Sequence, residues 1–307
     1  MIEYIDLNFR GSDRVIATAV LLGPDGVSLV DPGPTSCLPA LEDGLRQRGL
    51  SLRDVRNLLI THIHLDHAGA TGSILERVPS IRVYVHERGA PHMIDPAKLL
   101  ASATRLYGDQ MDALWGAFLP VPAASVNVLK GGERVAVAGT TLRVAYTPGH
   151  AKHHVSFLDE TTGAAYVGDT GGIRVSGDYL IAPTPPPDID LAAWRGSLTV
   201  IEAWQPVSLF LTHFGVVTGA KAHLARFRET LTAQAEAVRQ SLTAGSTDEA
   251  RTQAFVEQMR RDVRKAMPEH EARATELAAP FDQLWQGLER YWRKQAAKNE
   301  EQRTKNE

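Results

Sequence analysis

The stretch Thr61-His62-Ile63-His64-Leu65-Asp66-His67 carries four potential metal ligands within six residues. It follows an apolar run that reads as a buried strand and precedes a helix start rich in small residues. Imidazole and carboxylate groups are the usual ligands of zinc and related divalent metals. Alternation along an extended loop would place His62 and His64 on one side, where they can share a metal, and leave Asp66 and His67 for a second one. A merely polar loop would desolvate four such groups without a countercharge, which is costly.

This motif resembles the signature His-x-His-x-Asp-His of the metallo-beta-lactamase superfamily. The resemblance implies three further ligands in the order His, Asp, His, each just after a strand. The chain offers candidates in Thr147-Pro148-Gly149-His150, Gly168-Asp169-Thr170 and Leu211-Thr212-His213-Phe214-Gly215. The resemblance also implies an α/β fold, the αββα sandwich, with the metals at one edge of two sheets.

The same resemblance assigns a role to each candidate ligand. The first metal would be bound by His62, His64 and His150, the second by Asp66, His67 and His213, and Asp169 would bridge both. The implied cofactors are two divalent metal ions, with zinc expected and iron or manganese as alternatives. Two such ions lower the pKa of a shared water, so that a metal-bound hydroxide can attack an acyl or phosphoryl centre. We expect Asp66 to orient this nucleophile as well as to bind metal.

Four further residues are candidates for supporting the site or contacting substrate. Asp31 ends an early strand, where the superfamily commonly has an aspartate that supports the metal cluster, although an Asp that forms a turn before Pro is an equal alternative. His154, at the head of the next strand, is a candidate for a supporting or substrate contact. Tyr107 and Trp115 are candidates for a substrate pocket, but aromatic residues at helical spacing more often belong to a core.

Alternating strand and helix patterns run through residues 1–218, which we expect to form the catalytic domain. Apolar positions at helical spacing predict one or two helices, inserted in that domain, over 91–122. The pattern of 219–307 is purely helical and predicts a C-terminal extension that either closes the pocket or pairs with a second copy in a homodimer. The proline-rich run 183–187 predicts a stiff surface connection.

Within the extension, Ser246 with Glu249 predicts a capping box, and the charged tail from Lys294 is expected to fray. Elsewhere, we expect surface or capping roles for His86 and His92. We expect ordinary polar positions for His223 and His270. Cys37 is interpreted as a structural thiol, with a lowered pKa at a helix start as the alternative.

Composition narrows the class of partner. The formal net charge is -3 and the isoelectric point is about 6.4, so no global field attracts nucleic acid. A single cysteine excludes an intrachain disulfide and fits a reducing compartment. The N-terminal stretch does not resemble a signal peptide, and no segment approaches the ~18 apolar residues of a membrane helix. We therefore expect a cytoplasmic protein that acts on a small molecule.

Thr61, the Thr-Pro-Gly-His and Gly-Asp-Thr motifs and the helical extension are similar to the glyoxalase II-like branch of the superfamily. The leading interpretation is a dinuclear metal-dependent hydrolase of a small-molecule thioester, ester or lactone. The alternatives are a mononuclear iron enzyme of the persulfide dioxygenase kind, a nuclease of the ribonuclease Z type, and a non-catalytic assembly module. The low net charge and the lack of a basic arm argue against the nuclease.

Overall fold

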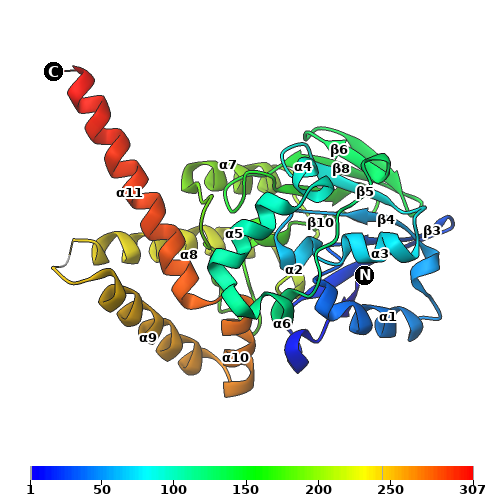
Figure 1. Ribbon diagram of the computed structural model, residues 1–307, viewed down its shortest axis with the longest axis horizontal. Helices are drawn as coiled ribbons and strands as arrows, with labels where there is room; N and C mark the ends of the chain where they lie inside the picture. The colour runs from blue at the N-terminus through cyan, green and yellow to red at the C-terminus, as the bar shows by residue number, and fades with distance from the viewer. Residues whose placement is uncertain (1, 244, 307) are drawn as a thin grey trace.

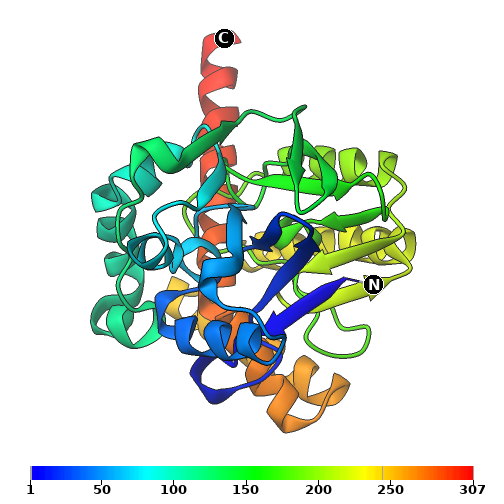
Figure 2. The same ribbon diagram turned by 90° about the vertical axis from the view of Figure 1, so that its right-hand side faces the viewer.

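Two six-stranded sheets stack face to face in the computed structural model, which describes residues 2–243 and 245–306 and leaves Met1, Ala244 and Glu307 outside its description (Figure 2). The first sheet contains, in spatial order, β1 (Glu3–Asp6), β2 (Ala17–Gly23), β3 (Gly26–Val30), β4 (Val55–Leu59), β5 (Arg82–His86) and β6 (Val126–Leu129). The second contains, in spatial order, β12 (Gly215–Thr218), β11 (Ser208–Leu211), β10 (Ala164–Tyr166), β9 (Val155–Asp159), β8 (Thr140–Tyr146) and β7 (Arg134–Val137).

Alternating side chains give each sheet two buried faces. In β2, Ala19 points into the cluster between the sheets, whereas Val20 packs in the cluster under the outer helices. In β11, Phe210 lies between the sheets, whereas Leu209 packs against helices of the other flank. Since successive residues of a strand point to opposite faces, both faces of both sheets must be covered.

Helices cover the two outer faces and complete the αββα sandwich expected from the resemblance (Figures 1 and 2). The first sheet is flanked by α1 (Leu38–Arg46), α2 (Leu65–Ala68) and α3 (Thr71–Arg77), and the second by α7 (Leu191–Ala203) and α8 (Ala220–Ser241). In α1, Leu38, Leu41 and Leu45 are buried at helical spacing.

Two β-hairpins join neighbouring strands of the second sheet. β7 pairs antiparallel with β8 through Gly139, and β9 pairs antiparallel with β10 through Gly163. Both turn glycines have positive φ angles, 71° and 72°, which side chains with a Cβ seldom adopt. In the first sheet β3, β4, β5 and β6 run parallel, whereas β1 and β2 are antiparallel to their neighbours.

The inserted segment is more broken than we predicted. It forms three α-helices, α4 (Ala90–Ile94), α5 (Ala97–Tyr107) and α6 (Met111–Trp115), rather than one or two. Pro96 precedes α5, and Gly108 and Gly116 follow α5 and α6 with positive φ angles, so each helix ends where the backbone departs from helical geometry. The strands β1, β6 and β12 were not anticipated, since four residues each are too few to show a period.

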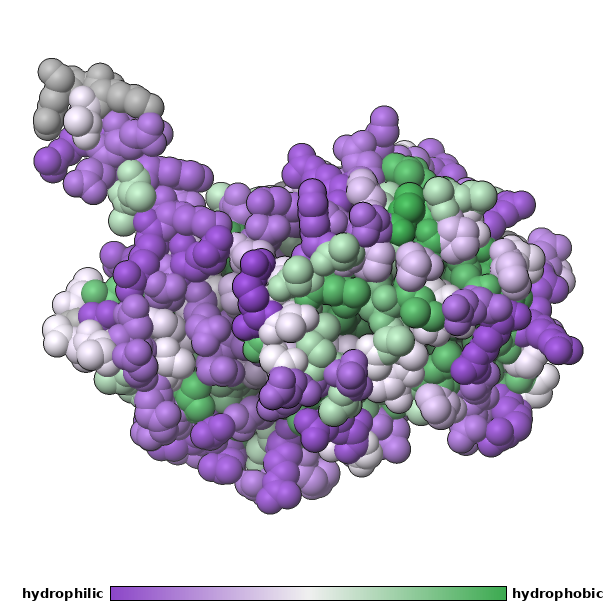
Figure 3. All heavy atoms as spheres, viewed as in Figure 1, coloured by the Kyte–Doolittle hydropathy of each residue, from purple (hydrophilic) through white to green (hydrophobic). Residues whose placement is uncertain are grey.

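The extension is helical, as expected, but differs in detail. It continues from α8 into α9 (Asp248–Ala266), α10 (Glu269–Ala278) and α11 (Phe281–Asn306). The side chain of Thr247, not Ser246, caps α9 by accepting the N–H of Ala250, so the predicted capping box is wrong. The tail does not fray at Lys294: α11 continues to Asn306 and projects from the body as a hydrophilic rod (Figures 1 and 3).

The apolar side of α11 is covered by its own chain. Leu284, Trp285 and Leu288 are buried, and the indole N–H of Trp292 donates to the carbonyl of Ala235 at 2.8 Å. The homodimer prediction therefore gains no support from the described residues. None of the described helices is both long and apolar enough to cross a membrane.

The segment 181–187, which we call the strap, is only partly the surface connection that we predicted over 183–187, since Pro187 is exposed and Pro185 and Pro186 are half-buried. Pro183 and Thr184 are buried, because α8 and α11 cover this segment. The Thr184 hydroxyl donates to the carbonyl of Leu284 at 3.0 Å. The Gln234 amide donates to the carbonyl of Ala182 at 2.8 Å and accepts the N–H of the same residue at 3.2 Å. The extension thus holds the strap against the sandwich.

Cys37 precedes α1 and is buried. Burial raises the pKa of its thiol to about 11. This direction is the opposite of the lowered pKa considered as an alternative, and it supports a structural thiol.

A glycine makes the contact between α11 and the strap possible. A Cβ at Gly287 would lie 1.9 Å from the carbonyl oxygen of Thr184, whereas a Cβ at Gly196, a helical glycine of α7, would have nothing within 4 Å. We predict that Gly287→Ala lowers the free energy of unfolding by about 1–3 kcal/mol through overpacking. Gly196→Ala should raise it by roughly 0.5–1 kcal/mol, because alanine favours a helix over glycine. Urea denaturation of both variants measures this, and a Gly287→Ala protein at least as stable as the parent would contradict the packing.

Candidate metal centre

The seven candidate ligands converge although they come from four separate stretches of the chain. His62 and His64 lie in the loop after β4, and Asp66 and His67 lie in the first turn of α2. The other three follow strands of the second sheet: His150 after β8, Asp169 in the 3-10 turn Gly168–Gly171 after β10, and His213 between β11 and β12. The structure therefore brings together at one sheet edge what the resemblance placed there.

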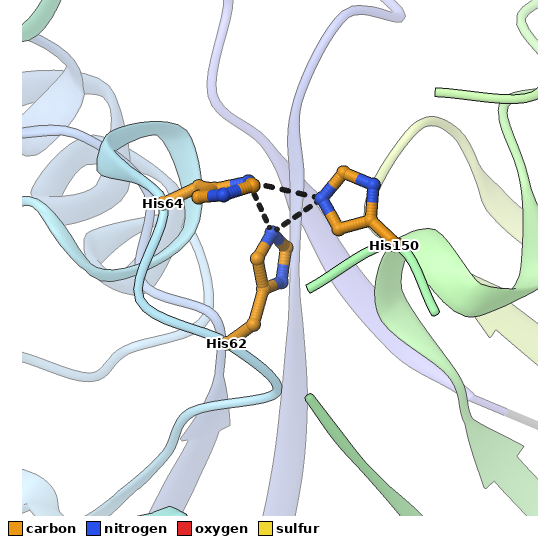
Figure 4. Close-up of side chains that lie close together, drawn as sticks. All are labelled: His62, His64 and His150. Carbon is orange, nitrogen blue, oxygen red and sulfur yellow. Dashed lines mark hydrogen bonds between the residues drawn. The ribbon is translucent and has the colours of Figure 1, made fainter. Parts of the chain in front are cut away.

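Three imidazoles form the first group (Figure 4). His62 Nε2 lies 2.9 Å from His64 Nδ1, and His150 Nε2 lies 3.1 Å from the former and 2.9 Å from the latter. The carbonyl of Pro183 accepts the Nδ1–H of His150 at 2.8 Å. A neutral His150 must therefore present an unprotonated Nε2 to the other two rings.

Asp66, His67 and His213 form the second group. Asp66 Oδ2 lies 3.2 Å from His213 Nε2 and 3.6 Å from His67 Nε2. The carbonyl of Val15 accepts the Nδ1–H of His213 at 2.7 Å, so the Nε2 of a neutral His213 also bears a lone pair.

Asp169 lies between the groups. Its Oδ2 is 3.4 Å from His150 Nε2 in the first group, and its Oδ1 is 3.3 Å from His67 Nε2 in the second. A carboxylate with one oxygen toward each group has the geometry of a bridging ligand.

The unsatisfied atoms of the site test whether cations fit it. His67 Nε2 and Asp169 Oδ1 are buried without a hydrogen-bond partner among the described residues. Buried polar atoms are ordinarily paired, and lone pairs that face one another repel. Divalent cations accept electron pairs from imidazole nitrogen and carboxylate oxygen, so the donor set fits metal ions.

Protonation favours the same conclusion for the first group and for Asp66, whereas the carboxylates around His67 and His213 outweigh burial and raise the pKa of both rings. Burial lowers the pKa of His64 to about 3 and that of His62 well below its ordinary value. Burial alone would raise the pKa of Asp66, but His67 and His213 outweigh it and hold this pKa at about 2. The first group is therefore neutral and the carboxylate ionised near neutral pH, which are the forms that bind metals.

Asp31 anchors the site from behind and is fully buried. Its Oδ2 accepts the Nδ1–H of His67 at 2.8 Å and the hydroxyls of Thr61 and Thr212 at 2.7 and 2.8 Å, and its Oδ1 accepts the N–H of Thr61 at 2.8 Å. This network ties one candidate ligand to the ends of β4 and β11. The contacts favour the supporting role over a simple turn, although φ at Asp31 is 53°.

His154 uses both of its nitrogens away from the metal ligands. Its Nδ1 bonds the hydroxyl of Thr147 at 3.0 Å, and its Nε2 accepts the N–H of Thr170 at 3.4 Å. Its ring stacks on that of His62 at 5.0 Å. His154 thus contacts a candidate ligand and the loop of Asp169, and it does not line the cavity described below.

A cavity of about 400 Å³ opens beside the two groups. Five candidate ligands line it, whereas His62 and His67 lie behind them. Tyr107 and Trp115 line it as well, and their rings meet edge to face at 5.1 Å. The two aromatic candidates therefore belong to the cavity wall and to the core at once.

Several contributors could not be found in the sequence. The carbonyls of Pro183 and Val15 orient ligand imidazoles, but a backbone acceptor has no residue signature. His223 was expected to be an ordinary polar position, yet it is buried and bonds the carbonyl of Gly171, in the turn that carries Asp169. The expected surface role of His86 is also wrong, since its side chain is buried and stacks on Tyr146. His92 lines the cavity, and His270 is exposed.

Comparison with known proteins supports the resemblance to the metallo-beta-lactamase superfamily. The metallo-beta-lactamase fold-containing protein ST1585 of Sulfurisphaera tokodaii is 29% identical over 164 residues, which are 52% of this chain and 61% of that protein. A hydroxyacylglutathione hydrolase of a Synechococcus species is 30% identical over 151 residues, which are 49% of this chain and 47% of that protein. The chain thus spans between about half and three fifths of these relatives.

The fold also matches a solved structure over nearly its whole length. The metallo-beta-lactamase family protein TTHA1429 of Thermus thermophilus superposes with a TM-score of 0.70 at 22% identity, covering 97% of this chain and 94% of that one. A sequence model described as the metallo-beta-lactamase superfamily matches residues 12–213. Since this match spans well over half of the chain, the protein belongs to the metallo-beta-lactamase superfamily, whose members are in general metal-dependent hydrolases.

Proposed function

We propose that the protein is a dinuclear hydrolase of small-molecule thioesters, esters or lactones. The observation that carries this proposal is the convergence of seven side-chain donors, with buried lone pairs that lack protein partners, beside a cavity of about 400 Å³. The name of the Synechococcus relative, hydroxyacylglutathione hydrolase, supports hydrolysis of this general kind.

In this proposal each group holds one divalent ion, which we take to be zinc. His62, His64 and His150 would hold the first, Asp66, His67 and His213 would hold the second, and Asp169 would be shared. When bound, the two ions would lower the pKa of water and polarise the carbonyl under attack. Asp31 and His154 keep the ligand rings oriented through the contacts described above.

Asp66 is the residue proposed to handle the proton. Its side chain is 21% exposed, compared with 6% for Asp169, and it faces the cavity. A carboxylate that reaches both the nucleophile and solvent can orient the attacking water, accept its proton and pass it on. Asp169 is too enclosed for that task, which suits a shared ligand.

The first prediction concerns metal content. Elemental analysis of the purified full-length protein should find two zinc ions per chain. Asp169→Asn should reduce this to one or fewer, because the shared ligand would lose its charge. Asp178→Asn, at an exposed carboxylate paired with Arg226, is the matched control and should retain two. One iron per chain would instead favour the dioxygenase alternative.

The second prediction concerns turnover. The metal-loaded protein should hydrolyse at least one member of a panel of thioesters, esters and lactones. Removal of the metal by a chelator should lower kcat/KM by about 100-fold or more, and added zinc should restore it. A metal-loaded protein without turnover on the whole panel would favour the non-catalytic assembly module. Turnover that persists after measured loss of metal would refute a metal-dependent reaction.

The third prediction concerns Asp31. Asp31→Asn replaces an acceptor of four hydrogen bonds by a side chain that also donates, so His67 would lose its fixed orientation. Metal affinity, measured by competition with a chromophoric chelator, should fall about 10–100-fold. Thr212→Val removes a single hydrogen bond of the network and should have a smaller effect. Unchanged affinity in a folded Asp31→Asn protein would reduce Asp31 to a turn residue.

A further inference from the structure

The cavity beside the metal centre is walled by three segments that are far apart in the sequence. The insertion contributes α5 and Trp115, the strap contributes its prolines, and the corner between α10 and α11 contributes residues 277–284. Figure 1 shows α5 in front of the sandwich and between it and the C-terminal helices. On this face apolar side chains gather over the region of α4 and α5 (Figure 3).

The wall away from the metal centre is mainly hydrophobic. Leu99 and Leu106 of α5 face the cavity, and Leu277 and Leu284 line it from the α10–α11 corner. Trp115 lies flat on Phe9, with ring centroids 5.5 Å apart, and both rings line the cavity. A surface of this kind favours apolar groups because their burial removes them from water.

The wall carries a minority of polar groups, among them Ser102, Tyr107 and the Nε1–H of Trp115, which has no hydrogen-bond partner among the described residues. The Tyr107 hydroxyl already donates to Oε1 of Gln283 at 3.4 Å, and burial raises the pKa of Tyr107, so it stays protonated. Lys98 and Arg105 are exposed on α5, so their stems line the cavity while their charges reach solvent. A peptide-like substrate would leave buried hydrogen-bonding groups unpaired here, which is costly.

The volume of the cavity limits the length of the apolar chain that it can hold. A volume of about 400 Å³ lies toward the lower end of the roughly 300–1,000 Å³ of small-molecule sites, which bury most of a drug-sized ligand. This is large for an acetyl group and small for a long lipid chain. It suits an apolar chain of medium length.

Resting on the hydrolase function proposed above, we propose that the substrate is a thioester or ester with an apolar acyl chain of medium length, seated between α5, Trp115 and the α10–α11 corner. The carbonyl then lies at the metal centre and the chain extends along the hydrophobic wall. Water attacks the carbonyl carbon and the bond to the thiol or alcohol breaks. The leaving group departs with one proton of the water, the other proton is released to solvent, and the carboxylate product keeps the chain.

The test uses the full-length, metal-loaded protein and thioesters of N-acetylcysteamine from acetyl to hexadecanoyl. We expect kcat/KM to rise with each methylene, by up to about fourfold, which is the limit set by ~0.8 kcal/mol per buried CH₂. The rise should end near octanoyl or decanoyl, where the cavity is full. S-lactoylglutathione, whose acyl group is short and polar, should be at least tenfold poorer than the octanoyl thioester.

Two variants test the location of the chain. Leu106→Trp replaces a leucine side chain of the wall by the larger indole and should move the optimum to shorter acyl chains. Leu22→Trp, at an exposed leucine outside the cavity, should keep the parent profile. Calorimetry with the product-like acids gives a readout without turnover, and octanoate should bind the metal-loaded protein at least tenfold more tightly than acetate.

The outcomes separate the inference from the function on which it rests. Hydrolysis without dependence on chain length, or with acetyl as the best acyl group, would overturn the inference and leave the hydrolase intact. An optimum that Leu106→Trp does not shift would also overturn it. No turnover of any thioester, ester or lactone would overturn the function, and equal binding of octanoate and acetate would then overturn the hydrophobic site as well.

Discussion

Repulsion between seven clustered electron-pair donors, five of them buried, is the constraint on which the rest of this molecule depends. Among the described residues, His67 Nε2 and Asp169 Oδ1 are buried without a hydrogen-bond partner, although they lie 3.3 Å apart, and three imidazole nitrogens meet within 3.1 Å of one another. Such an arrangement is stable only when each ring is held from its far side and the centre is neutralised. Asp31 and the carbonyls of Pro183 and Val15 do the first. The second is the task that we assign to divalent cations.

The supports come from every layer of the fold. Asp31 joins β4 to β11 through Thr61 and Thr212, so the two sheets and one ligand share a single carboxylate. Pro183 belongs to the strap, which α8 and α11 hold in place. The C-terminal helices are therefore connected to the metal centre through the backbone of the strap, and the same helices supply a wall of the cavity. Support of the ligands and shaping of the substrate site are two consequences of one packing arrangement.

Long apolar periods were predictable, and short or tightly covered elements were not. The helix with Leu38, Leu41 and Leu45 and the hairpins around Gly139 and Gly163 follow from spacing and turn residues. The strands β1, β6 and β12 were missed because four residues scarcely define a period. The burial of Pro183 and Thr184 in the strap was missed because prolines exclude a helix but say nothing about burial. The Thr184 hydroxyl can be buried because it accepts a hydrogen bond from Gln234 and donates one to the carbonyl of Leu284, 50 and 100 residues away along the chain.

The sequence by itself determined which donor groups the candidate centre contains. The residue types of the candidate ligands and their positions after strands are local properties, and they can be read from the motif around His62 and from those at His150, Asp169 and His213. Only the tertiary structure decided how these ligands are oriented and what lies beside them. The carbonyls that orient the rings belong to no residue type, and the cavity wall joins Phe9, α5 and the α10–α11 corner across most of the chain. Such a surface arises from packing between distant segments, and packing depends on shape in three dimensions rather than on any local pattern.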